Sequence, residues 1–133
     1  MTIELINPPD LSKPTGYSHV AIVSSGRQLH LSGQVALNAA GALVGKDDLA
    51  AQTEQVYVNL RAGLAAGGAT LRDVFKVVAY VVGLTPERAA AVRTVRAKHL
   101  GDGPYPASTM VGVTSLIHPD LLIEIEVIAA LDG

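Results

Sequence analysis

Two glutamates near the end of the chain are the residues best suited to chemistry. Glu124 and Glu126 lie two positions apart in the otherwise aliphatic run of residues 121–128. Side chains alternate along a β-strand, so both carboxylates are expected on the same face. They are either ordinary surface acids at solvent or a subunit boundary, or one is a partly buried general acid/base with a pKa raised by desolvation.

The first part of the chain predicts strands. Residues 17–24 and 29–32 are rich in alternating apolar residues, and residues 25–28 between them contain a glycine, which favours a β-hairpin. A further short extended piece is expected over residues 35–37 and 43–44, around a polar turn.

Helices and further strands follow. Asp48 is a predicted N-cap, and apolar residues at helical spacing predict a helix of about 18 residues that stops at Gly67. The β-branched run 74–82 predicts a central strand covered on both faces. Thr85 and the proline after it begin a second helix, which ends at His99 or Leu100.

These elements predict an α+β fold. Two final strands are expected at residues 109–113 and 121–130. This order favours two helices on one face of a mixed β-sheet, with the other sheet face left to be covered by an oligomer. A length of 133 residues predicts a single domain over residues 1–133.

The composition limits the kinds of molecule that the protein is expected to bind. The chain has 49% apolar residues but only four tyrosines and one phenylalanine, no cysteine and a net charge of −2. The absence of cysteine fits a reducing compartment, so a cytoplasmic location is expected. No apolar run reaches the roughly 18 residues that span a bilayer, and no basic stripe indicates nucleic acid, so neither membrane nor RNA is an expected partner.

The segment Pro106–Ala107–Ser108, with the later run Ile123–Glu124–Ile125–Glu126, resembles the signature of the RidA (YjgF/YER057c/UK114) family. The resemblance extends over residues 17–129. It implies a chorismate mutase-like α+β fold and a homotrimer with a barrel-like centre.

The resemblance also implies roles for residues in a cleft between neighbouring subunits. Glu124 matches the glutamate that positions or activates the attacking water, whereas Glu126 is interpreted as structural. Without the resemblance, Tyr17 would be a strand-edge aromatic, Gly33 a bulge or turn, and Tyr105 simply a packing residue. The expected substrate-binding residues are Tyr17, Ser32, Gly33, Tyr105, Ser108 and Thr109.

Ser108 stands where deaminating members carry the arginine that grips a substrate carboxylate. A bidentate guanidinium contributes about 1.5 to 3 kcal/mol through charge-assisted hydrogen bonds, which a serine hydroxyl cannot replace. Either the ligand lacks that carboxylate, or another cation reaches the pocket, or the activity is lost. Arg93 on the second helix is one such cation, with a solvated helix-face arginine as the alternative.

Three functions remain open at this point. The first is a RidA-like imine or enamine deaminase that needs no cofactor, and the second is a non-catalytic trimer that binds a small metabolite. The third is the endoribonuclease activity of some relatives, which the acidic balance disfavours. The four histidines have no HxH or HExxH spacing, so no metal site is expected.

Overall fold

The computed structural model describes residues 2–24 and 26–131. Its element order is β1 (Ile3–Ile6), β2 (Val20–Val23), β3 (Arg27–Gln34), α1 (Leu49–Ala66), a 3-10 turn (Leu71–Asp73), β4 (Val74–Val82), α2 (Pro86–Leu100), β5 (Ala107–Val113) and β6 (Ile123–Leu131). The main sheet has the strand order β3-β6-β4-β5. Strands β4 and β5 are parallel and the other pairs are antiparallel, so the predicted mixed sheet is confirmed.

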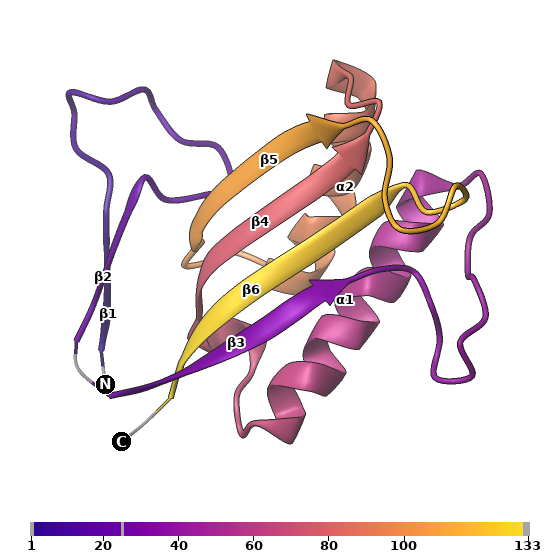
Figure 1. Ribbon diagram of the computed structural model, residues 1–133. Coiled ribbons are helices and arrows are strands. Elements are labelled where there is room, and N and C mark those ends of the chain that lie inside the picture. Colours follow the sequence, from indigo (N-terminus) through magenta and orange to yellow (C-terminus); the bar gives the residue numbers. More distant parts are fainter. Residues whose placement is uncertain (1, 25, 132–133) are drawn as a thin grey trace.

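Both predicted helices form at the expected positions. The Asp48 side chain accepts a hydrogen bond from the Ala51 N–H at the start of α1, and the Thr85 hydroxyl caps α2 by accepting from the Arg88 N–H. Both bonds satisfy backbone donors that the first turn of a helix leaves unpaired. The two helices lie side by side behind the sheet in Figure 1 and cover one of its faces.

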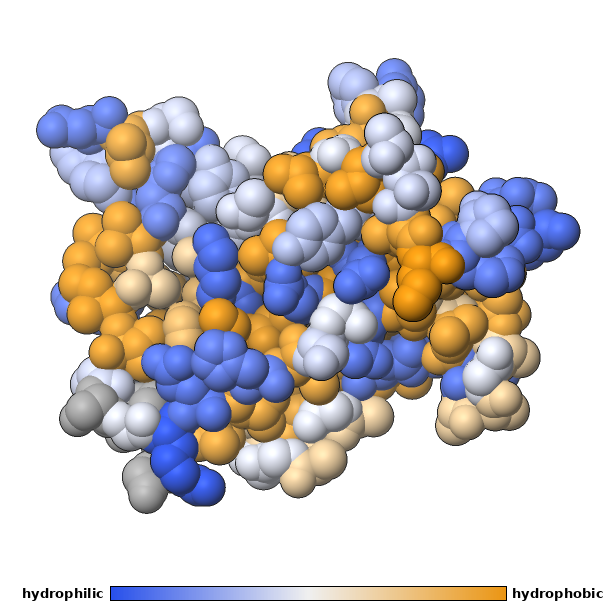
Figure 2. All heavy atoms as spheres, in the orientation of Figure 1, coloured by the Kyte–Doolittle hydropathy of each residue, from blue (hydrophilic) through white to orange (hydrophobic). Residues whose placement is uncertain are grey.

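The core lies between this helical layer and the sheet. Leu60 and Leu64 of α1, Val92 of α2 and Ile123 and Ile125 of β6 are all buried. Strand β4 is interior, as predicted, and Val77, Ala79 and Val81 alternate toward the helices. Within one chain β4 is covered by the helices on one face, and its alternate residues on the open face are partly buried. Figure 2 shows apolar and hydrophilic residues mixed over this open face.

The predicted hairpin between residues 17–24 and 29–32 is wrong. Strand β2 pairs with β1, from Ile3 opposite Val23 to Ile6 opposite Val20. Strand β3 pairs instead with β6. The missed strand β1 supplies the backbone partners that the hairpin would have given β2. Ser25, in the predicted turn, lies outside the described residues.

Smaller corrections concern the remaining segments. Residues 35–44 form one isolated bridge, between Leu37 and Leu43, around a turn in which the Asn38 side chain accepts from the Ala40 and Ala42 N–H groups. Strand β5 begins at Ala107, two residues earlier than predicted, and so includes Ser108. Within the described ranges, none of the helices combines the length and apolar character needed to cross a membrane.

Candidate functional site

The two glutamates of β6 share the open face of the sheet but differ in their surroundings. Glu126 accepts a hydrogen bond from the Tyr80 hydroxyl of β4. This bond raises the pKa of Tyr80, and desolvation and the charges of Glu126 and Glu124 raise it further. Glu126 is therefore engaged in a strand-to-strand contact.

Glu124, by contrast, has a half-buried carboxylate with no hydrogen-bond or ion-pair partner among the residues that the structure describes. It lies over Gly33 of β3, so closely that a Cβ at position 33 would collide with the carboxylate. The pairing of β3 with β6 is irregular between Leu31 and Gln34, which places Ser32 and Gly33 in a β-bulge. The bulge and the absent side chain leave room for the carboxylate.

A second group of predicted residues gathers at the β5 edge of the sheet. Ser18 forms a parallel bridge with Ala107, donates its N–H to the Pro106 carbonyl (2.9 Å) and donates its hydroxyl to the Tyr105 carbonyl (2.6 Å). These bonds hold Tyr17 beside the loop before β5. The Tyr105 hydroxyl donates to the Gly101 carbonyl (2.7 Å), so it is already engaged within the chain.

Ser108 and Thr109 point to opposite faces of the sheet. Ser108 is in register with Val77, whose side chain is buried under the helices, so Ser108 faces the helical layer. Thr109 is in register with Val78 on the open face, where its Oγ1 is 3.5 Å from the Lys76 ammonium. Sequence alone gave no strand pairing from which to assign these faces.

The structure thus separates the predicted site into two halves. Ser32, Gly33 and Glu124 lie toward the β3 edge, whereas Tyr17, Tyr105, Ser108 and Thr109 lie at the β5 edge. Glu124 lies on β6, so β4 alone separates it from Thr109 of β5, whereas both β6 and β4 separate Gly33 from Thr109. With about 4.8 Å between neighbouring strands, these separations are roughly 10 Å and roughly 14 Å across the sheet.

A pocket lies beside each half of the predicted site. A hollow of about 420 Å³ beside β3 is lined by Gly33, Gln34 and residues of α1, including Asn59. A hollow of about 210 Å³ beside the β5 edge is lined by Tyr105, Gly16, Arg93 and Arg96. Arg93 is exposed on α2, and Arg96, which the sequence analysis missed, is half-buried. Their spacing of three residues on a helix was the available signal.

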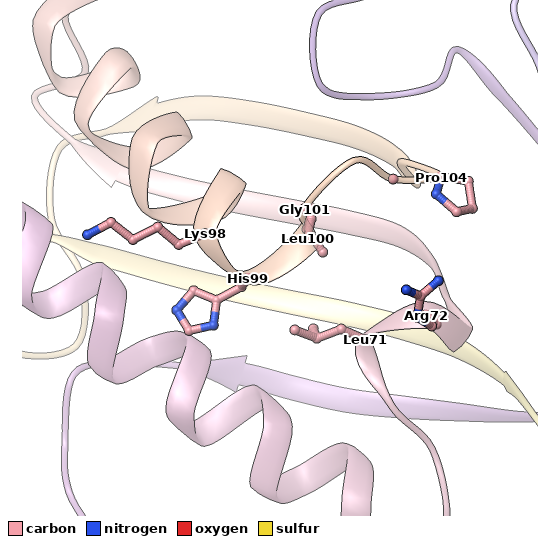
Figure 3. Close-up of a pocket in the computed structure, with 8 residues that line it drawn as sticks. Leu71, Arg72, Lys98, His99, Leu100, Gly101 and Pro104 are labelled. Carbon is pink, nitrogen blue, oxygen red and sulfur yellow. The ribbon is translucent and has the colours of Figure 1, made fainter.

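Figure 3 shows a third pocket, of about 200 Å³, between the end of α2 and the turn before β4. Its Lys98 and Arg72 side chains lie at opposite ends of the view. His99 is occupied elsewhere: its Nδ1 accepts from Arg61 Nε (3.1 Å), its Nε2 contacts Glu54 (3.0 Å), and its ring stacks on Tyr57. This histidine therefore supports the packing of α1 against α2.

No group of three or more histidine, aspartate or glutamate side chains is close enough to hold a metal ion within residues 2–24 and 26–131. The predicted site residues supply a carboxylate, the hydroxyls of tyrosine, serine and threonine, and backbone amides, and the guanidinium groups of Arg93 and Arg96 lie beside the β5 half.

Comparisons with known proteins agree with this architecture. The family model described as Endoribonuclease L-PSP matches residues 10–131. A RutC family protein of Pyrococcus horikoshii is 35% identical over 127 residues, which cover 95% of this chain and 96% of the relative. A 2-iminobutanoate/2-iminopropanoate deaminase of Dermatophagoides farinae is 29% identical over 129 residues and is covered over 96% of both chains.

A solved structure shows the same fold along nearly the whole chain. It is a Yersinia pestis protein of unknown function from the conserved Rid protein family, with 45% identity and a TM-score of 0.90. The match covers 98% of this chain and 100% of that one.

Proposed function

Because the chain belongs to the Rid (YjgF/YER057c/UK114) family, we propose that it hydrolyses the C=N bond of a small, reactive imine or enamine and releases ammonia. A similar chain of Dermatophagoides farinae carries the name of such a deaminase. The observation that carries the proposal is the Glu124 carboxylate, half-buried above Gly33 and without a partner among the described residues. A free carboxylate at such a place can orient a water molecule.

The reaction needs one base and one water. Glu124 accepts one proton from the water as the water oxygen bonds to the imine carbon, and it passes this proton to the imine nitrogen, which gives a carbinolamine. The carboxylate then takes the proton of the carbinolamine hydroxyl and delivers it to the nitrogen as the C–N bond breaks, so that ammonia and a carbonyl product leave. The net change is addition of one water and loss of one ammonia, so no cofactor is required.

The site is completed between two copies of the chain. Ser32 and Gly33 lie at the β3 edge with Glu124 on the neighbouring β6, whereas Tyr17, Tyr105 and Thr109 lie at the opposite, β5 edge. A cyclic arrangement that brings the β5 edge of one copy to the β3 edge of the next would join them, and three copies would enclose the open sheet faces. The half-buried residues of that face support the homotrimer.

Ser108 narrows the expected substrates. It faces the helical layer and offers no charge, so it cannot grip a carboxylate as a guanidinium would. An imine whose carboxylate is held by another cation, or an imine without one, is expected. The same feature favours a second candidate function, a trimer that binds a small metabolite without turning it over.

The decay of 2-iminopropanoate, generated by an amino-acid oxidase and trapped with semicarbazide, tests these functions. The protein is expected to lower the amount of trapped imine. A parallel assay with an imine that lacks a carboxylate separates substrate choice from loss of activity. If the protein accelerates neither decay but binds a related oxo acid, the non-catalytic function holds and the deaminase proposal fails.

A further inference from the structure

The pocket beside α2 brings two arginines together. Arg93 and Arg96 line it with Thr15, Gly16, Ala97 and Tyr105, and its volume is about 210 Å³. A cavity needs roughly 10–15 Å³ of such volume to hold one water, so this pocket has room for several waters. It can therefore take a ligand with a short carbon skeleton.

The two guanidinium groups have no counter-ion within residues 2–24 and 26–131. Neither arginine forms an ion pair or side-chain hydrogen bond with any residue that the structure describes. The groups that influence the charge of Arg96 are Tyr57, Arg93 and Tyr105, and no carboxylate is among them. Burial lowers the pKa of Arg96, and the Arg93 charge lowers it further, yet a guanidinium stays protonated in proteins. The pocket therefore carries two positive charges, and no carboxylate of the described residues neutralises them.

Arg96 also reaches the loop before β2. Its Nη2 lies 2.8 Å from where a Cβ at position 16 would be, so the guanidinium lies directly beside Gly16. Gly16 has a φ of +74°, which favours glycine. Arg96 also lies near enough to the buried Tyr57 for its charge to offset part of the effect of burial on the pKa of that phenol. The Arg96 guanidinium thus lies close to both the Gly16 loop and Tyr57.

We propose that this pocket is a binding site for a small organic carboxylate, held by the paired guanidinium groups of Arg93 and Arg96. A planar guanidinium matches a carboxylate with two parallel hydrogen bonds. The Tyr105 ring and the Ala97 methyl group form apolar walls for a short carbon chain, which favours an organic acid over inorganic phosphate. The inference does not rest on the imine chemistry.

The pocket in Figure 3 lacks these features. Its Lys98 and Arg72 lie at opposite ends of the view, and both are exposed. Arg72 is therefore a suitable matched control, because its loss removes an equal charge without touching the proposed site.

Titration calorimetry with propionate and, separately, with inorganic phosphate tests the site in the full-length protein. Propionate binding is expected to weaken roughly tenfold to a hundredfold in Arg96→Gln, since a charge-assisted bidentate contact is lost. Arg93→Gln, at an exposed position that packing does not need, should weaken it as well, whereas Arg72→Gln and Glu124→Gln should leave it unchanged.

Several results would overturn the assignment. These are retention of propionate binding in both Arg93→Gln and Arg96→Gln, equal weakening in Arg72→Gln, or binding of phosphate but not propionate. Because Glu124→Gln removes the proposed catalytic group and spares this pocket, failure of the deaminase function and failure of this site give different results.

Discussion

The difference between Glu124 and Glu126 is set by single contacts. Their shared strand face follows from the two-residue period of a strand, as the sequence predicted. Their different environments do not follow from that period, because Glu126 meets the Tyr80 hydroxyl across the sheet and Glu124 meets a bulge at Gly33. The Glu126 carboxylate is therefore hydrogen-bonded within the sheet, whereas the Glu124 carboxylate has no partner among the described residues.

A methyl group at position 33 should disturb this arrangement. Gly33→Ala is expected to destabilise the protein by about 1 to 3 kcal/mol, because the new Cβ and the Glu124 carboxylate cannot occupy the same space. Urea unfolding of Gly33→Ala, Glu124→Ala and the double variant measures the coupling. The double variant should be more stable than the sum of the single effects implies. Strict additivity would show that the two residues do not compete for space.

The pKa values of Tyr80 and Tyr57 allow a test by pH titration. The hydrogen bond to Glu126 raises the pKa of Tyr80, whereas burial raises that of Tyr57 to about 12. In Glu126→Ala, tyrosinate absorbance should show the Tyr80 step at lower pH and the Tyr57 step unchanged. The folded-state pKa of Tyr80 lies above its unfolded value. The stability that the Tyr80–Glu126 hydrogen bond contributes is therefore complete below about pH 10, and it is lost as pH rises through the folded-state pKa of Tyr80. An unmoved Tyr80 step would contradict the contact.

At the scale of elements, the buried side chain of Gln52 holds the segment that precedes β6. Gln52 of α1 is fully buried, and its Nε2 donates to the Asp120 carbonyl (2.8 Å) and the Gly45 carbonyl (3.2 Å). Its Oε1 accepts from the Leu122 N–H (2.8 Å). The helix thereby anchors the segment immediately before Glu124.

Loss of this anchor should be costly. Gln52→Leu leaves the Asp120 carbonyl and the Leu122 N–H without this partner, whereas the Gly45 carbonyl still accepts from the Asp48 N–H. We therefore expect a loss of about 2 to 4 kcal/mol in the free energy of unfolding. Gln55→Leu, on the same helix, removes only a contact with Asn59 and should cost less than about 1 kcal/mol. Denaturant melts of both variants measure the difference, and equal losses would refute a special role for Gln52.

Local signals predicted some elements well. Asp48, Thr85 and the proline after it mark helix starts through short-range bonds that are visible in sequence, and both helices begin there. Strand pairing depends on distant partners, so the β2–β3 hairpin was wrong and β1 was missed. The separation of Ser108 from Glu124 likewise depends on which strands lie between them.

For the whole molecule, the open sheet face is the expected subunit interface. Val111 of β5 lies on this face and is 39% exposed, and Val58 on α1 is a matched exposed valine at 48%. A lysine at an interface would bury a charge, whereas a lysine on the outer helix surface remains in water.

Light scattering should therefore give a mass near three times the chain's 13.8 kDa for the wild type and for Val58→Lys. Val111→Lys should shift toward the single-chain mass. A trimer that tolerates Val111→Lys but is lost in Val58→Lys would place the interface on the helical layer instead.

The measurement that bears most directly on the proposed function is the rate of imine decay with wild-type protein and with Glu124→Gln, at equal concentrations and after both are shown to be folded. The wild type should accelerate decay, Glu124→Gln should return it to the rate without protein, and Glu126→Gln should retain most of the acceleration. Equal rates with the wild type and Glu124→Gln would contradict the role of Glu124 in orienting the attacking water.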